Sequence, residues 1–214
     1  MSVATMIRAI VRGSSEEGNA EIDKARQVLV SQGYPALTEL TRRGKGYQAM
    51  TTAAGAALVV RPSTVALATL HNLATSPFHL VIYRVFAFNL VSTAAEARAG
   101  IWLCSHPVGQ TAPTNDITVR NSTSGKAAGD GGHTILDAGA TVADDGWFPW
   151  GDGKFDVEPT GVLPGAVSSP IINGAIIVPP GAGLSGTVVS SVAGNTYTFG
   201  FHWFAVPNSE MSID

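Results

Sequence analysis

The feature that most constrains the fold of this chain lies near its end, where aromatic residues recur at every second position. Residues 196–203 read Thr-Tyr-Thr-Phe-Gly-Phe-His-Trp, so Tyr197, Phe199, Phe201 and Trp203 alternate with smaller or polar residues. Successive side chains of a β-strand point to opposite faces, so the four aromatic rings share one face. This alternation predicts a strand whose aromatic face packs into a core completed by another sheet.

From residue 56 onward the chain consists of short apolar segments separated by residues that favour turns. The separators include Arg-Pro, Ser-Pro, Gly-Asp-Gly-Gly and Pro-Pro-Gly, which end strands and form turns. The expected strands cover residues 57–61, 64–70, 78–90, 99–104, 116–119, 133–136, 171–178, 184–192 and 196–206. Short strands without an intervening helical pattern predict a mainly β domain over residues 56–206, built as an antiparallel β-sandwich.

The expected strand at residues 78–90 is apolar on both faces apart from His79 and Arg84. Such a strand belongs in the middle of a covered sheet or at an interface. Charged residues make up only 14% of the chain, against about 25% in a typical soluble protein. Either contacts between subunits hide part of the surface, or the surface is an ordinary β surface rich in Gly, Ser and Thr. The first explanation predicts a homo-oligomer.

Residues 1–55 are expected to form an N-terminal arm, and residues 207–214 a C-terminal tail. In the arm, Ser14 and Glu17 have the spacing of a capping box, and apolar residues then recur at helical spacing until Gly33. This pattern predicts one helix over about residues 15–32. A solitary amphipathic helix of this length is marginal in water, so we expect it to pack on the β domain or on another subunit.

A basic stretch with two glycines follows at residues 41–47, and its cations are Arg42, Arg43 and Lys45. It is interpreted as a solvated linker or as an attachment contact with a partner. Three cations without interleaved aromatic residues are a weak footprint for nucleic acid, which is therefore not an expected partner. No segment approaches the roughly 20 apolar residues of a membrane span, and no signal peptide is evident. Synthesis in a cytoplasm and no membrane partner are expected.

The acidic and aromatic segment at residues 144–158 is the part of the chain most like a ligand site. Carboxylates at Asp152, Asp156 and Glu158 could supply oxygen ligands to Ca²⁺, although their spacing fails the EF-hand pattern. Trp147 and Trp150, if exposed, could stack on a sugar ring. The alternative is a long loop that its aromatic residues pin to the sandwich or to a neighbouring subunit.

The remaining residues that could carry chemistry are scattered. The histidines lack zinc-ligand spacing and are expected in the core or at an interface; they are His71, His79, His106, His133 and His202. Cys104, the single cysteine, is expected to be a small buried hydrophobe. Residues 183–187 lack the final glycine of a nucleophile elbow. The sequence therefore predicts no catalytic residue, no cofactor and no enzyme, although a Ser, His and Asp triad can assemble from distant residues.

Three segments of the chain resemble surface proteins of the heads and tails of tailed bacteriophages. They are residues 86–95 (Phe-Ala-Phe-Asn-Leu-Val-Ser-Thr-Ala-Ala), 176–181 (Ile-Ile-Val-Pro-Pro-Gly) and 198–203 (Thr-Phe-Gly-Phe-His-Trp). The resemblance covers roughly residues 46–206 and contains no diagnostic motif. It implies a jelly-roll-like sandwich that assembles as a symmetric oligomer, often a trimer, on the surface of the virion.

The resulting interpretation is a virion structural protein, a capsid cement or decoration subunit that contacts itself and the major capsid protein or other virion proteins. The β domain would be the oligomer core and the arm the attachment device. Many equivalent weak contacts would together hold such a subunit in place. Two alternatives stay open: a receptor- or carbohydrate-binding module of a phage tail tip, and a glycan-cleaving enzyme that uses paired carboxylates of the segment 144–158.

Overall fold

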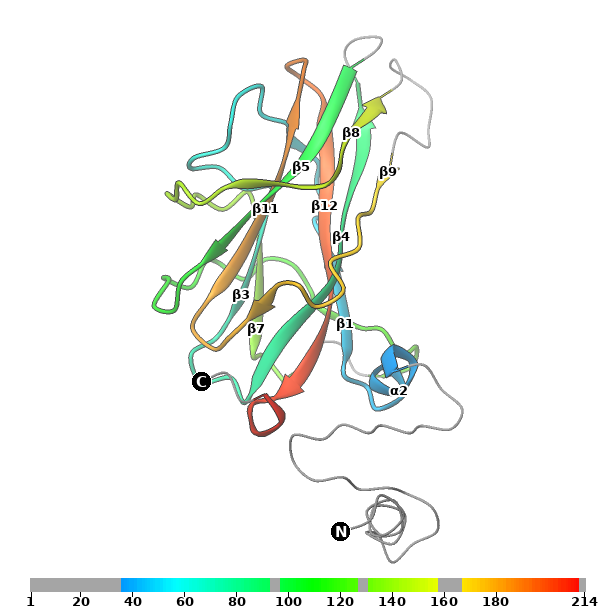
Figure 1. Cartoon of the computed structure of the whole chain (residues 1–214), viewed down its shortest axis with the longest axis vertical. Helices are drawn as coiled ribbons and strands as arrows, with labels where there is room; N and C mark the ends of the chain where they lie inside the picture. The colour runs from blue at the N-terminus through cyan, green and yellow to red at the C-terminus, as the bar shows by residue number, and fades with distance from the viewer. Residues whose placement is uncertain (1–35, 93–96, 127–130, 158–166, 212–214) are drawn as a thin grey trace, which may run out of the picture.

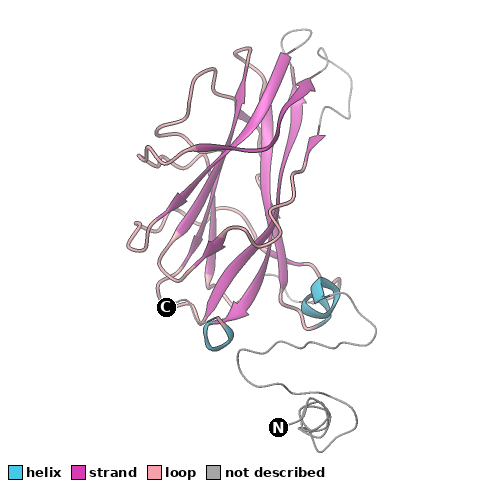
Figure 2. Cartoon of the chain, in the orientation of Figure 1, coloured by secondary structure: helices cyan, strands magenta, loops and turns pink. Residues whose placement is uncertain are grey.

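The chain folds into two β-sheets that pack face to face (Figures 1 and 2). The structure is a computed structural model, and it describes residues 36–92, 97–126, 131–157 and 167–211. The strands of each sheet pair in antiparallel fashion. The predicted mainly β, antiparallel sandwich is therefore confirmed.

Sheet A has seven strands and sheet B has five. The strands of sheet A are β1 (Gly46–Met50), β2 (Gly55–Ala56), β4 (Phe78–Val91), β6 (Arg120–Asn121), β9 (Val167–Ser168), β10 (Ile177–Val178) and β12 (Thr196–Pro207). Those of sheet B are β3 (Ala68–Asn72), β5 (Ala97–His106), β7 (Thr134–Ala138), β8 (Phe148–Val157) and β11 (Gly183–Ser190). The described helices are α2 (Ala36–Arg42) and the 3₁₀ helix η1 (Asn208–Glu210). Neither helix has the length or the hydropathy to cross a membrane.

The order of strand pairing is that of a jelly roll. Strand β1 pairs with the last strand, β12, and β3 pairs with the next to last, β11. Strand β4 pairs with β9 and β10, and β5 pairs with β8. The chain is thus folded back on itself as a nested set of antiparallel pairs, divided between two sheets. Strands β6 and β7 are additions in the connection from β5 to β8.

The core lies between the sheets and is built around the aromatic residues of β12. Tyr197, Phe199, Phe201 and Trp203 are all fully buried there, as their alternation predicts. Opposite them, Gly186 of β11 leaves room for Phe199, because a Cβ at Gly186 would lie 2.2 Å from the ring. A side chain at position 186 would therefore displace the Phe199 ring from the core.

The sandwich begins earlier in the chain than the sequence analysis expects. Residues 46–50, assigned there to the arm, form β1 between β12 and β6. Tyr47 packs on Trp203 with a ring-centroid distance of 6.2 Å, which explains why this short segment joins the sheet. The helix expected over residues 15–32 lies outside the described residues.

Two of the expected strands do not form. In the segment 57–61, Leu58 makes only an isolated bridge with Val189. The segment 116–119 is not a strand either, but Ile117 and Val119 are buried in the core. Their apolar side chains fill the interior without strand pairing, so hydrophobicity alone predicted a strand where the chain forms a buried loop.

Candidate functional site

The outer face of sheet B carries polar side chains in a row across three strands. Ser185 of β11 lies directly opposite Thr69 of β3 on one side and Cys104 of β5 on the other. His106 follows two residues after Cys104, so both side chains share one face of β5. All four residues are buried. The register of the sheet therefore gathers a hydroxyl pair, a thiol and an imidazole that are far apart in sequence.

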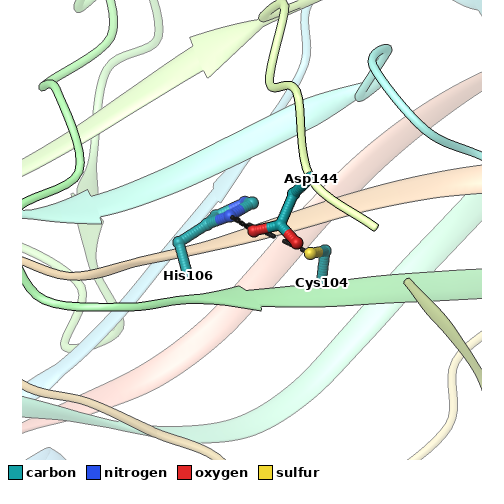
Figure 3. Close-up of side chains that lie close together, drawn as sticks. All are labelled: Cys104, His106 and Asp144. Atoms are coloured by element: carbon teal, nitrogen blue, oxygen red, sulfur yellow. Dashed lines mark hydrogen bonds and ion pairs between the residues drawn. The ribbon is translucent and has the colours of Figure 1, made fainter. Parts of the chain in front are cut away.

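A loop at residues 139–147 covers this row and delivers a carboxylate to it. Backbone hydrogen bonds attach the loop to the segment before β3, among them Val142 N–H to Thr64 C=O at 2.7 Å and Asp144 N–H to Ser63 C=O at 3.0 Å. Trp147, at the end of the loop, packs with Cys104 in a small hydrophobic cluster. Asp144 is thereby held over β5 (Figure 3).

The side chains form a continuous chain of polar contacts. His106 Nδ1 lies 2.8 Å from Asp144 Oδ2, and His106 Nε2 lies 2.7 Å from Ser185 Oγ. Ser185 Oγ lies 2.8 Å from Thr69 Oγ1. Cys104 Sγ lies 3.9 Å from His106 Nδ1, on the side of the ring that faces Asp144 (Figure 3). The His106 ring is therefore held at both nitrogens.

Burial and hydrogen bonding set the charges of the cluster. Burial, together with the nearby Asp144 carboxylate, raises the pKa of the Cys104 thiol from 9.0 to about 12. The Gly146 N–H, which donates to Asp144 Oδ1 at 2.7 Å, and the His106 ring hold the pKa of Asp144 below its ordinary value. At neutral pH the cluster thus contains a carboxylate and a neutral thiol.

The row Asp144, His106 and Ser185 has the connectivity of a Ser-His-Asp triad, but it is not placed for nucleophilic catalysis. Ser185 is fully buried in the middle of β11, and its Oγ also bonds Thr69. A substrate carbonyl cannot reach that oxygen unless the groups that cover the row are displaced. The thiol, imidazole and carboxylate offer instead three metal-ligand atoms, all within 4.8 Å of one another.

The segment 144–158 differs from the loop that the sequence predicts, because residues 148–157 form strand β8 on β5. Trp147 is only 3% exposed, so the expectation that it is presented for stacking on a sugar is wrong. Trp150 is half-buried against the core, with its ring 5.9 Å from that of Phe148. The aromatic residues pin this segment to the sandwich, which was the alternative interpretation.

The residues named for calcium are placed only in part. Asp152 and Asp156 lie within β8, where the structure describes the backbone alone, and Glu158 lies outside the described residues. The calcium site stays a prediction.

The three cations named as an attachment site lie at the end of α2 and just before β1. Arg42 and Arg43 are exposed, and each bonds Glu39 through its Nε at 2.7 Å. These bonds lower the pKa of Glu39 from 4.5 to about 2. The Lys45 ammonium lies 4.5 Å from the centroid of the Phe78 ring. The two arginines are therefore partly neutralised within their own helix.

The outer face of sheet A carries a group of apolar side chains, which we call the apolar face, and Gln48, His202 and Arg84 lie on the same side of the sheet. Strand pairing places its members side by side on β1, β4, β9 and β10 and at the isolated bridge between Arg84 and Ile171. They are Met50, Tyr83, Phe86, Phe88, Val167, Ile171 and Ile177. Several are substantially exposed, among them Val167 at 59% and Ile171 at 55%. The inner face of the same sheet is already filled by the core, so β4 is apolar on both faces, as its sequence indicates.

The sequence predicts some of the residues of the cluster on sheet B to be buried. Cys104 and the histidines His71, His79 and His106 are buried, as expected. The spacing Cys104-x-His106 within an apolar run is a local signal that both side chains share a strand face, but the sequence analysis did not use it. Asp144 reaches them from 38 residues beyond His106, which no spacing rule predicts.

Comparisons of the chain with protein-family models, with curated proteins and with solved structures give no match.

Proposed function

We propose that this chain is a virion structural protein, a cement or decoration subunit that stabilises a capsid. It self-associates, as an expected trimer, and contacts the major capsid protein or other virion proteins. The observation that carries the proposal is the apolar face of sheet A, of which Met50, Val167, Ile171 and Ile177 stay exposed although the core beneath it is complete. No catalytic role is proposed, since the triad-like row contains a serine that substrates cannot reach.

The apolar face suits protein contact for a physical reason. Monomeric proteins rarely expose contiguous apolar patches larger than a few hundred square ångströms. Burying such surface stabilises an interface by about 25 cal/mol per Å² before the costs of association. Within β4, Arg84 is the only Lys, Arg, Asp or Glu, so few charges would lose their hydration when the face is covered. A subunit that repeats one such contact many times gains from multivalency.

The jelly-roll topology is consistent with a virion protein, but it does not distinguish this function from others that use the same fold. Viral capsid proteins use this fold, and so do lectin domains and cupins. The buried Trp147 removes one of the two side chains on which a carbohydrate-binding module would depend. The apolar face therefore favours the assembly role over the tail-tip alternative.

The proposal is tested by quantifying the chain in purified particles from its source by mass spectrometry with isotope-labelled standards. A cement protein is expected in many copies, in a fixed small-integer ratio to the major capsid protein. Only a few copies per particle would support the tail-tip module instead. Absence from all particle fractions would contradict a virion role.

A further inference from the structure

We propose that Cys104, His106 and Asp144 form a binding site for a divalent transition-metal ion of the Zn²⁺ type. The site lies on the outer face of sheet B and is independent of the assembly role argued above. Its ligands would be Cys104 Sγ, His106 Nδ1 and an Asp144 carboxylate oxygen (Figure 3). A bound ion would connect the loop 139–147 to strand β5.

The donor atoms match the chemistry of such an ion. Zn²⁺ in proteins takes sulfur, nitrogen and oxygen ligands in a tetrahedral arrangement, at about 2.3 Å for sulfur and about 2.0–2.2 Å for nitrogen and oxygen. Those bond lengths place sulfur about 3.5 Å from nitrogen, and nitrogen about 3.3 Å from oxygen. The present separations are 3.9 Å for Sγ to Nδ1 and 2.8 Å for Nδ1 to Oδ2. Changes of about half an ångström in these two separations would match a tetrahedral site.

The surroundings of the ligands are already arranged as in a metal centre. A ligating histidine usually donates its other ring N–H to an oxygen, which fixes the tautomer and the ring orientation. Ser185 Oγ lies 2.7 Å from His106 Nε2 and can accept the hydrogen bond from Nε2–H, while it contacts Thr69 on its other side. This tautomer leaves the Nδ1 lone pair facing Asp144 and Cys104. The Gly146 N–H fixes Oδ1 of Asp144 at 2.7 Å.

The site also has an entry path from solvent. The His106 side chain is 2% exposed, whereas that of Asp144 is 21% exposed, so solvent reaches the cluster at the carboxylate. A fourth position would be filled by water or by the second carboxylate oxygen. On binding, the thiol proton is released to solvent and the thiolate coordinates the metal. The negative charge of the thiolate then partly compensates the charge of the ion.

The competing account is a hydrogen-bonded network without metal, in which Nδ1–H donates to Asp144 and Cys104 only fills space. The two accounts differ in the role of the sulfur. Because Cys104 is the only cysteine, a sulfur-to-metal signal in the full chain can come from no other residue.

The test uses Co²⁺ as a spectroscopic probe on the purified, metal-stripped full chain. We expect a thiolate-to-cobalt charge-transfer band in the near ultraviolet. We also expect visible d–d bands with the high absorption intensity of tetrahedral Co²⁺. Stoichiometric Zn²⁺ should abolish both signals. Cys104→Ser should lose the charge-transfer band, and Asp144→Asn should bind more weakly. The matched control is Asp145→Asn, the neighbouring exposed carboxylate, which should bind as the wild type does. Ser185→Ala should keep the band but lose about 10–100-fold in affinity.

Far-ultraviolet circular dichroism checks that each variant is folded. A wild-type protein that gives no charge-transfer band at millimolar Co²⁺ would overturn the proposal, and so would equal Co²⁺ affinities for Asp144→Asn and Asp145→Asn. The wild-type spectrum decides the matter even if Cys104→Ser fails to fold.

Discussion

Trp203 shows how a single large side chain fills the core between the two sheets. It is the largest fully buried residue of the core, and Tyr47 of the neighbouring strand β1 packs on it at 6.2 Å. Its Nε1–H has no hydrogen-bond partner among the described residues. The ring therefore contributes through its volume and apolar surface, at some cost for the buried N–H.

Replacing Trp203 with Ala should lower the free energy of unfolding by roughly 3–5 kcal/mol, because it leaves a cavity in a packed core. Trp203→Phe should cost less, since it keeps most of the ring and removes the unpaired N–H. Urea unfolding monitored by circular dichroism measures both, with the exposed Gln48→Ala as control. Equal losses for Phe and Ala would show that the indole N–H makes a bond that the structure does not contain.

Individual residues differ in how well the sequence predicts their surroundings. The aromatic alternation of residues 197–203 is a local pattern with a period of two, so it correctly indicates both the strand and its buried face. The contact between His106 and Asp144 depends on how a loop crosses a sheet, and no local pattern encodes that crossing. Trp147 was misjudged for the same reason, because its burial depends on the loop 139–147.

At the scale of elements, β4 and β12 form the centre of sheet A. Side chains on their outer side are packed against one another and partly buried. Thr198 is buried on that side, and Gly200 lies under the Phe86 ring, which a Cβ would meet at 2.3 Å. Farther along, His202 lies between the rings of Tyr83 and Phe204, at centroid distances of 5.3 and 5.4 Å. The outer side of this strand pair is thus a packed layer in its own right.

His202 predicts a pH dependence of stability. Burial, and secondarily the charge of Arg84, lowers its pKa below the ordinary value of 6.5. The unfolded chain therefore binds this proton more readily, so the stability that neutral His202 contributes is present above about pH 6.5 and is lost as the pH falls below it. The loss for one proton is at most about 1.4 kcal/mol per pH unit.

Urea unfolding at about pH 7.5 and about pH 5.5 checks this prediction. The wild type should lose more stability between the two than His202→Gln does. His71, whose pKa burial also lowers, acts in the same direction, so the variant should keep part of the dependence. An identical pH dependence for the variant and the wild type would show that His202 accepts a proton in the folded state as easily as in the unfolded state.

At the scale of the whole molecule, the jelly roll has one complete interior and two unlike outer faces. Sheet B is covered on its outer side by a loop and a polar cluster, whereas sheet A presents the apolar face. The low charge content and the doubly apolar strand 78–90 predict an interface from the sequence, and that interface stays a prediction. The position of the apolar face on sheet A could not be predicted, because it depends on which strands become neighbours in the sheet.

Self-association through the apolar face is the central claim, and sedimentation equilibrium at micromolar concentration tests it most directly. The wild type should sediment as an oligomer, with three times the 22.1 kDa subunit mass for the expected trimer. Val167→Glu places a charge on the apolar face and should shift the protein to monomer. Val108→Glu is the matched control, because Val108 is equally apolar and 67% exposed but lies in the loop after β5, and it should leave the oligomer intact. A wild-type monomer, or an oligomer that Val167→Glu leaves unchanged, would contradict the account.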